Sequence, residues 1–143
     1  MRLLILLTAL LGSCAPGYHA AFKKEAALLP DPPVSTEGAW KGSWKSDTNG
    51  HLGPLWCIVL PSPGKPGTHD FSYRAGWGVL RFGNYTHTTP TTRNRDGSLI
   101  LNGAMALPAG LGTYKVKGKL TATTFDATYS SKHDSGSFTL RRP

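Results

Sequence analysis

From residue 38 to the end of the chain, short runs of aromatic and β-branched residues recur about every 10–15 positions, separated by Gly, Pro, Asn and Asp. This spacing is typical of all-β meanders, sandwiches and barrels. No stretch repeats apolar residues at a 3.6-residue period over the length that a core helix needs. We therefore predict an all-β domain over 38–143, with strands near 39–46, 54–60, 69–77, 79–88, 98–107, 113–120, 123–130 and 137–142.

The predicted strands suit an antiparallel barrel. Their side chains alternate, and in the run 69–77 the inward face would carry Phe71, Tyr73, Ala75 and Trp77. The run 54–60 is apolar on both faces, so we expect both faces to be covered, the outer one by the segment that precedes residue 38. Eight consecutive strands with short turns fit an up-and-down barrel, whose interior is filled by side chains or holds one small ligand. A β-sandwich or an open curved sheet is the alternative.

The first 13 residues have the pattern of a secretory signal peptide. Arg2 supplies a positive charge, Leu3 to Leu11 is apolar except for Thr8, and the small residues Gly12 and Ser13 follow. The apolar run is too short for a membrane-spanning helix, which needs about 20 residues. We predict that residues 1–13 are removed on export. An ordinary secretory signal with an incidental cysteine is one interpretation.

The other interpretation starts from Leu11-Gly12-Ser13-Cys14, which resembles the lipobox of bacterial lipoproteins. In that family the cysteine receives a thioether-linked diacylglycerol, the leader is cut off before it, and the new amino group is acylated. The resemblance implies lipidation at Cys14 and a membrane as a partner through the lipid. Ala15 stands where the family's inner-membrane retention signal has Asp, which implies the outer membrane of a two-membrane bacterium, facing the periplasm. A secreted protein is the alternative.

Residues 14–37 would then be a lipidated N-terminus and a flexible tether. The sequence Pro30-Asp31-Pro32-Pro33 favours an extended spacer, and the whole segment could reach ~75 Å when stretched. The part from Ala20 to Leu29 has the composition of one or two helical turns at a membrane surface. We predict a barrel domain over 38–143 that stands clear of the bilayer.

The opening of that domain, Gly38-Ala39-Trp40, resembles the Gly-x-Trp on the first strand of lipocalins and avidins. The later Thr-Asp-Tyr-type motif of lipocalins has no counterpart where it would be expected, and neither have the biotin ligands of avidins. The resemblance therefore implies a small β-barrel and no particular ligand.

The formal net charge of +8 is spread over strands and turns. Lys115, Lys117 and Lys119 alternate, so they share one strand face, which favours a solvated face that also protects a sheet edge. We expect no nucleic-acid partner. Attraction to anionic envelope lipid or acidic polysaccharide is the use of this charge that we consider most plausible.

Residues with chemical potential are scattered. The five histidines show no metal-binding spacing, the serines no Gly-x-Ser-x-Gly elbow, and the glycines no phosphate loop. Asp47, Asp96 and Asp134 lie in predicted turns, where an aspartate caps local backbone. Cys57 lies in an apolar run and is expected to be a buried small hydrophobe. We predict no enzymatic activity, no cofactor and no metal; a small envelope hydrolase with dispersed carboxylates is the alternative.

The aromatic residues carry the remaining functional signal. Our main interpretation is that they fill the barrel, which makes the protein a lipid-anchored envelope module with a structural or binding role. The alternative is a pocket for a small apolar or saccharide ligand. Its walls would be Trp40, Trp44, Tyr73 and Trp77.

Overall fold

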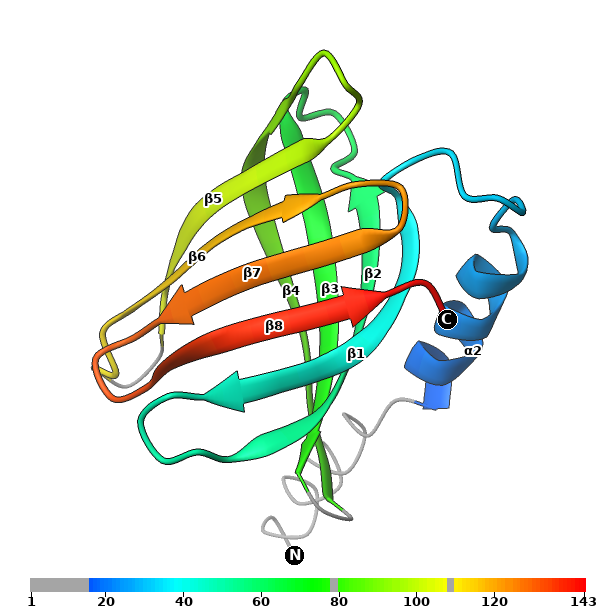
Figure 1. The fold of residues 1–143 in the computed structure, drawn as a ribbon. Coiled ribbons are helices and arrows are strands. Elements are labelled where there is room, and N and C mark those ends of the chain that lie inside the picture. The colour runs from blue at the N-terminus through cyan, green and yellow to red at the C-terminus, as the bar shows by residue number, and fades with distance from the viewer. Residues whose placement is uncertain (1–15, 78–79, 108–109) are drawn as a thin grey trace, which may run out of the picture.

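The computed structural model describes residues 16–77, 80–107 and 110–143, with the side chains at 16, 77 and 80–83 left out (Figure 1). The chain forms a closed, eight-stranded antiparallel barrel in which each strand pairs with its neighbours in sequence and β1 pairs with β8. The predicted fold class is therefore confirmed. The elements are α2 (Pro16–Ala27), β1 (Gly38–Ser46), β2 (Leu52–Pro61), β3 (Thr68–Trp77), β4 (Leu80–Arg93), β5 (Leu99–Ala106), β6 (Thr113–Leu120), β7 (Thr124–Ser130) and β8 (Ser135–Arg141).

The predicted strands match the observed ones closely, because alternation and turn residues are local signals. After the strand predicted to 88, the polar stretch that follows could either extend it or form a long bend; the structure shows the extension, with β4 continuing to Arg93. Cys57 is fully buried, as expected, and forms no disulfide. The leader and Cys14 lie outside the described residues.

The two ends of the barrel differ. The closed end is defined by the loops 62–67, 94–98 and 121–123, and the fully buried rings of Trp40, Phe71 and Phe125 lie there. There the ring of Phe125 meets Trp40 and Phe71 edge to face, with centroids 5.8 and 5.9 Å apart. The open end is defined by the turns 47–51 and 131–134 and the starts of β2, β6 and β8.

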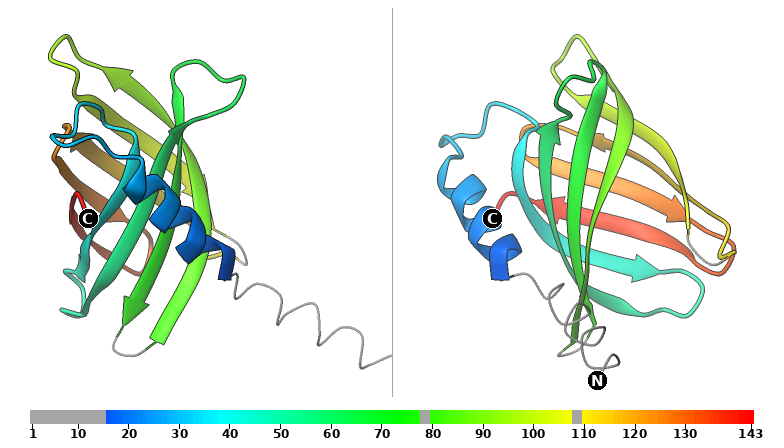
Figure 2. Two further views of the ribbon diagram at one scale, coloured as in Figure 1. Left: turned by 90° about the vertical axis from the view of Figure 1, so that its right-hand side faces the viewer. Right: turned by 180° about the vertical axis from the view of Figure 1, so that it is seen from behind.

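Helix α2 lies outside the barrel against β1 and β2 (Figure 2). Its Tyr18 and Phe22 are buried against Ala39 and Ile58 on the outer barrel surface. The Tyr18 hydroxyl also donates a hydrogen bond of 2.8 Å to the carbonyl of Ser72. The structure thus differs from the expected free tether over residues 16–27, because the apolar outer face of β2 is covered by this helix. That both faces of this strand are covered agrees with the prediction.

The helix runs from the open end of the barrel towards the closed end (Figures 1 and 2). Its first turn is fixed at Ser72, in the middle of β3, and Leu29, just beyond its last turn, lies against Gly38 at the start of β1. Within the described residues, no helix has the length and apolar character needed to cross a membrane.

The strands β4 and β5 are paired over only a short length. Their register comprises Thr91 with Leu101, Thr92 with Ile100 and Arg93 with Leu99, all near the closed end. Among the described residues beyond these pairs, 84–90 of β4 and 102–106 of β5 are not paired with each other, and the two strands diverge (Figure 1).

The sequence explains where this pairing stops. The Thr91 amide donates to Gly67 on the β3 side, so the neighbouring position in β4 faces β5. That position is Pro90, which has no N–H to donate. A groove lined by Pro90, Asn102, Gly103, Ala104, Lys115 and Lys117 marks the resulting seam.

Candidate functional site

A cavity of about 320 Å³ lies inside the open end of the barrel. This volume is at the lower limit of small-molecule pockets, which typically measure about 300–1,000 Å³. The lining residues come from seven of the eight strands and the turn before β8. They are Trp44, Leu55, Ala75, Tyr85, Tyr114, Tyr129, Asp134 and Phe138.

The aromatic walls of the cavity hold one another in place. Tyr129 stacks on Tyr114 at 5.9 Å and on Phe138 at 5.1 Å between ring centroids. Tyr85 stacks at 5.2 Å on Tyr73, which is almost fully buried behind it. Such contacts favour single side-chain positions, so the cavity is largely formed before a ligand enters.

The side chain of Trp44 is held in place by the backbone of β2 and β3. Its indole N–H donates a 2.9 Å hydrogen bond to the carbonyl of Gly76. A Cβ atom at position 53 would lie 1.8 Å from that carbonyl oxygen and 2.7 Å from the indole nitrogen. Only glycine at position 53 is compatible with this arrangement, so Gly53 helps to position the cavity wall.

Asp134 provides the charge of the cavity. Its Oδ1 accepts a 2.5 Å hydrogen bond from the hydroxyl of Ser46, and its Oδ2 accepts one of 2.9 Å from the hydroxyl of Tyr129. Burial opposes the ionisation of Asp134, but the hydrogen bonds from hydroxyls outweigh it and lower the pKa of the carboxyl below its ordinary 3.8. The carboxylate is therefore ionised at neutral pH.

Three buried side chains at or behind the cavity wall, those of Tyr73, His87 and Tyr114, have polar atoms without a well-formed hydrogen bond within the described part of the chain. The hydrogen-bonding groups that act on the pKa values of Tyr114 and His87 are Tyr85 and the backbone of Ala104, respectively. The rings of His87 and Tyr114 are 6.0 Å apart between centroids. Burial lowers the pKa of His87 below its usual value of 6.5, so this imidazole is neutral at pH 7. Buried polar atoms without a well-formed hydrogen bond are uncommon in cores and are available to a ligand or to water.

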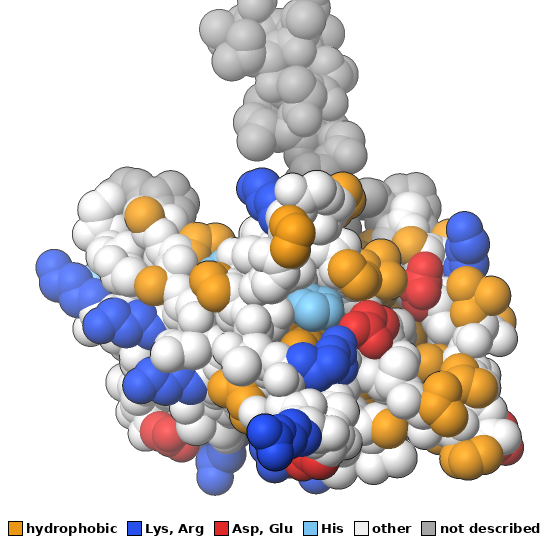
Figure 3. All heavy atoms as spheres, turned by 90° about the horizontal axis from the view of Figure 1, so that it is seen from above, with side chains coloured by type: hydrophobic (Ala, Val, Ile, Leu, Met, Phe, Trp, Pro, Cys, Tyr) orange, Lys and Arg blue, Asp and Glu red, His pale blue; other side chains and the backbone are white. Residues whose placement is uncertain are grey.

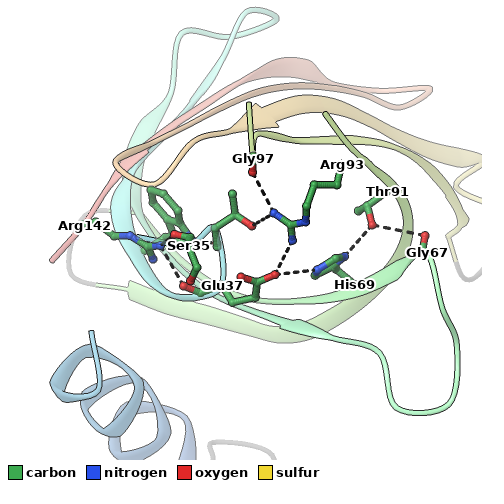
Figure 4. Close-up of polar contacts among 10 residues, drawn as sticks. Ser35, Glu37, Gly67, His69, Thr91, Arg93, Gly97 and Arg142 are labelled. Carbon is green, nitrogen blue, oxygen red and sulfur yellow. Dashed lines mark hydrogen bonds and ion pairs between the residues drawn. The ribbon is translucent and has the colours of Figure 1, made fainter. Parts of the chain in front are cut away.

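The closed end carries a separate polar network (Figure 4). One carboxylate oxygen of Glu37 lies 2.7 Å from Nη2 of Arg93 and 3.3 Å from Nε2 of His69. The other ring nitrogen of His69 lies 2.7 Å from the hydroxyl of Thr91. Burial acts to raise the pKa of Glu37, but its hydrogen bonds and the charge of Arg93 lower it overall. This network ties the segment before β1 to β3 and β4.

Arg142 completes the closure of this end. Its guanidinium lies 3.6 Å above the ring of Trp40 and donates hydrogen bonds to backbone carbonyls. The accepting residues are Ser35, Glu37, Ala39 and Ala122. Burial lowers the pKa of Arg142 to about 10, so the side chain is still charged at neutral pH. Seen from above in Figure 3, acidic, basic and histidine side chains lie together at the centre of the closed end.

The structure separates the four aromatic residues expected to form a pocket. Trp44 lines the cavity, whereas Trp40 is fully buried at the closed end under Arg142. Tyr73 lies behind the wall formed by Tyr85, and the side chain of Trp77 is outside the described residues.

Other residues of the site carried weaker signals in the sequence. Tyr85, Tyr114, Tyr129 and Phe138 are strand residues that alternation alone could have placed inside. Asp96 caps its turn as expected, accepting from the amide and the hydroxyl of Ser98. Asp134 also lies in a turn, yet its side chain bonds to Ser46 at the end of the neighbouring strand β1.

Within the described residues, no group of three or more His, Cys, Asp or Glu side chains could hold a metal ion. Comparison of the chain with protein-family models, with curated proteins and with solved structures finds no match.

Proposed function

We propose that this protein is a lipid-anchored cell-envelope protein without enzymatic activity, which binds a small and largely apolar ligand in the open end of its barrel. The observation that carries the proposal is the aromatic cavity of about 320 Å³. Most of its wall is apolar, and a few polar groups converge on it, which is the usual composition of a small-molecule site.

The contrast within the barrel supports a binding role. The closed end holds fully buried rings beneath Arg142, whereas the open end leaves a cavity between its rings. The cavity walls are held by stacking and by the hydrogen bond from Trp44 to Gly76. Empty space surrounded by fixed side chains lowers stability, because the lining atoms lose their packing partners. A ligand that fills this space restores those contacts.

The anchoring part of the proposal rests on the leader and Cys14. Two or more acyl chains hold a protein stably at a membrane, whereas one chain binds only marginally. Helix α2 begins at Pro16, two residues after Cys14, so an anchored cysteine would lie within about 8 Å of the first residue of the helix. Because α2 packs on the barrel, the domain would be held close to the bilayer, with the first turn of the helix nearest to it.

The binding proposal can be tested by filling the cavity. Ala75 lines it, so Ala75→Trp should occupy the space and weaken the binding of a neutral apolar probe, N-phenyl-1-naphthylamine, at least tenfold. The measurement is the saturable increase in probe fluorescence. Ala20→Trp is the matched control, because Ala20 is exposed on the outer side of α2. Equal binding by the two variants, or no saturable binding by the wild type, would contradict the proposal.

The anchor can be tested by intact mass spectrometry of detergent-extracted protein. We expect a species that begins at Cys14 and carries diacylglycerol and acyl mass, and Cys14→Ser should release the protein from the membrane fraction. A mature chain that starts elsewhere and carries no lipid would overturn the anchor and leave the binding proposal intact.

A further inference from the structure

The charge inside the open end is opposite to that of the whole protein. The chain carries a formal net charge of +8, yet Asp134 is the charged side chain among the residues that line the described cavity. The other lining residues are aromatic or aliphatic. A single ionised carboxylate beside apolar walls favours a ligand whose own charge compensates it.

The groups that hydrogen-bond Asp134 are uncharged. They are the hydroxyls of Ser46 and Tyr129, with further contributions from the Thr48 side chain and the Ser135 backbone. These neutral donors hold the carboxylate in place without cancelling its charge. Among the described side chains, Asp134 forms no ion pair with Lys, Arg or His.

The aromatic walls of the cavity, like the carboxylate, can attract a cation. The face of an aromatic ring carries negative potential and attracts ammonium groups that lie within about 6 Å of its centroid. Five of the eight lining residues are aromatic: Trp44, Tyr85, Tyr114, Tyr129 and Phe138. Tyr129 is stacked on Tyr114 and on Phe138, whereas Tyr85 stacks on Tyr73, which lies behind it. A ring face that borders the cavity beside the carboxylate would attract an ammonium group, as in sites that bind quaternary ammonium ligands.

We infer that the ligand is a small organic cation, with a substituted ammonium group against Asp134 and the aromatic walls and an apolar or weakly polar remainder within the cavity. This inference rests on the proposed binding function and names the chemical class of its ligand. An anionic ligand would be repelled by Asp134, and the described lining residues include no cation to offset that repulsion. The hydroxyl of Tyr114, in the cavity wall, can hydrogen-bond a hydroxyl or carbonyl group on the remainder of the ligand.

A pair of isosteres tests the inference directly. Choline and 3,3-dimethylbutan-1-ol have the same shape and hydroxyl group, but the second has carbon in place of the charged nitrogen. Calorimetric titration should show choline binding at least tenfold more tightly to the wild type. Asp134→Asn should remove most of that difference, whereas Asp126→Asn, which removes an exposed carboxylate paired with Arg141 on the outer surface, should preserve it.

A second variant keeps the test decisive if Asp134→Asn fails to fold. Tyr85→Leu keeps an apolar wall and removes one ring, so it should weaken choline binding several-fold and change the binding of the neutral alcohol little. Equal affinity for both isosteres, unchanged by either variant, would overturn the cationic class while leaving the binding function. No binding of either isostere, together with unaltered binding of N-phenyl-1-naphthylamine by Ala75→Trp, would mean that the proposed binding function itself is wrong.

Discussion

At the closed end of the barrel, Trp40 and Phe71 contact Phe125 edge to face and fill the interior, whereas at the open end Tyr114, Tyr129 and Phe138 stack along the wall and leave about 320 Å³ free. The same eight strands build both ends. The difference arises from what covers them: the segment before β1 and the last residues of the chain cross the closed end, whereas among the described residues the open end is bordered by turns. Under the proposed function, the closed end would carry stability and the open end would carry binding.

The largest expected effect comes from the two interior tryptophans. Trp40→Ala should reduce the free energy of unfolding by about 3–5 kcal/mol, because it empties a filled region and removes the ring under Arg142. Trp44→Ala should cost roughly half of that or less, because Trp44 is only partly buried and already borders a cavity. Urea unfolding of both variants measures the difference. Equal losses would remove the distinction between the two ends.

Arg142 should have the next largest effect. Arg142→Ala removes the hydrogen bonds to four backbone carbonyls and the stacking on Trp40, so we expect a loss of about 2–4 kcal/mol. Arg142→Lys keeps the charge but not the fork of donors, and its loss should be intermediate. Thermal unfolding ranks the three proteins, and ligand binding at the open end should be unchanged in the folded variants. If Arg142→Lys were as stable as the wild type, the positive charge alone, and not the hydrogen bonds of the guanidinium, would account for the stabilisation by Arg142.

Adding side-chain volume should lower stability more in the filled region than beside the cavity. Ala127→Leu adds volume to the core, where Ala127 faces Gly118, and should cost about 1–3 kcal/mol. Ala75→Leu adds the same volume beside the cavity and should cost less than about 1 kcal/mol. Chemical denaturation of the pair is the measurement, and a larger loss for Ala75→Leu would argue that the cavity cannot accept additional atoms.

The smallest expected effect concerns pH. The pKa of Glu37 is lower in the folded chain than its ordinary 4.5, through its hydrogen bonds and Arg93, so its stabilising contribution is complete above pH 4.5 and is lost as the pH falls through the folded value. Glu37→Gln should therefore be less stable than the wild type by about 0.5–1 kcal/mol at pH 7 and nearly equal to it in strong acid. Denaturation midpoints at several pH values test this, and a constant difference between the two proteins would assign the effect to something other than ionisation.

The sequence predicted the strands because both of its signals are local: alternation along each strand and turn residues between strands. Helical turns were expected over 20–29, but on a membrane surface. The stripe Tyr18, Phe22 and Ala26, spaced four residues apart, was a local signal for a longer helix with one face buried on the domain. The network of Glu37, His69 and Arg93 had no local signal, because only closure of the barrel brings residues so distant in sequence together. Which inward rings fill space and which border it depends on packing across the barrel, so Trp40 and Trp44 could not be distinguished beforehand.

The proline in β4 has a mechanical consequence. A β-barrel resists widening where every strand is hydrogen-bonded to both of its neighbours, so that the bonding is continuous around the circumference. Near the closed end every neighbouring pair of strands is bonded, but beyond Pro90 this bonding is interrupted between β4 and β5. The cylinder is therefore split along part of its length, rigid at one rim and compliant at the other. At the compliant rim, β4 and β5 can separate without breaking a hydrogen bond between them, whereas the opposite rim keeps the strands in register.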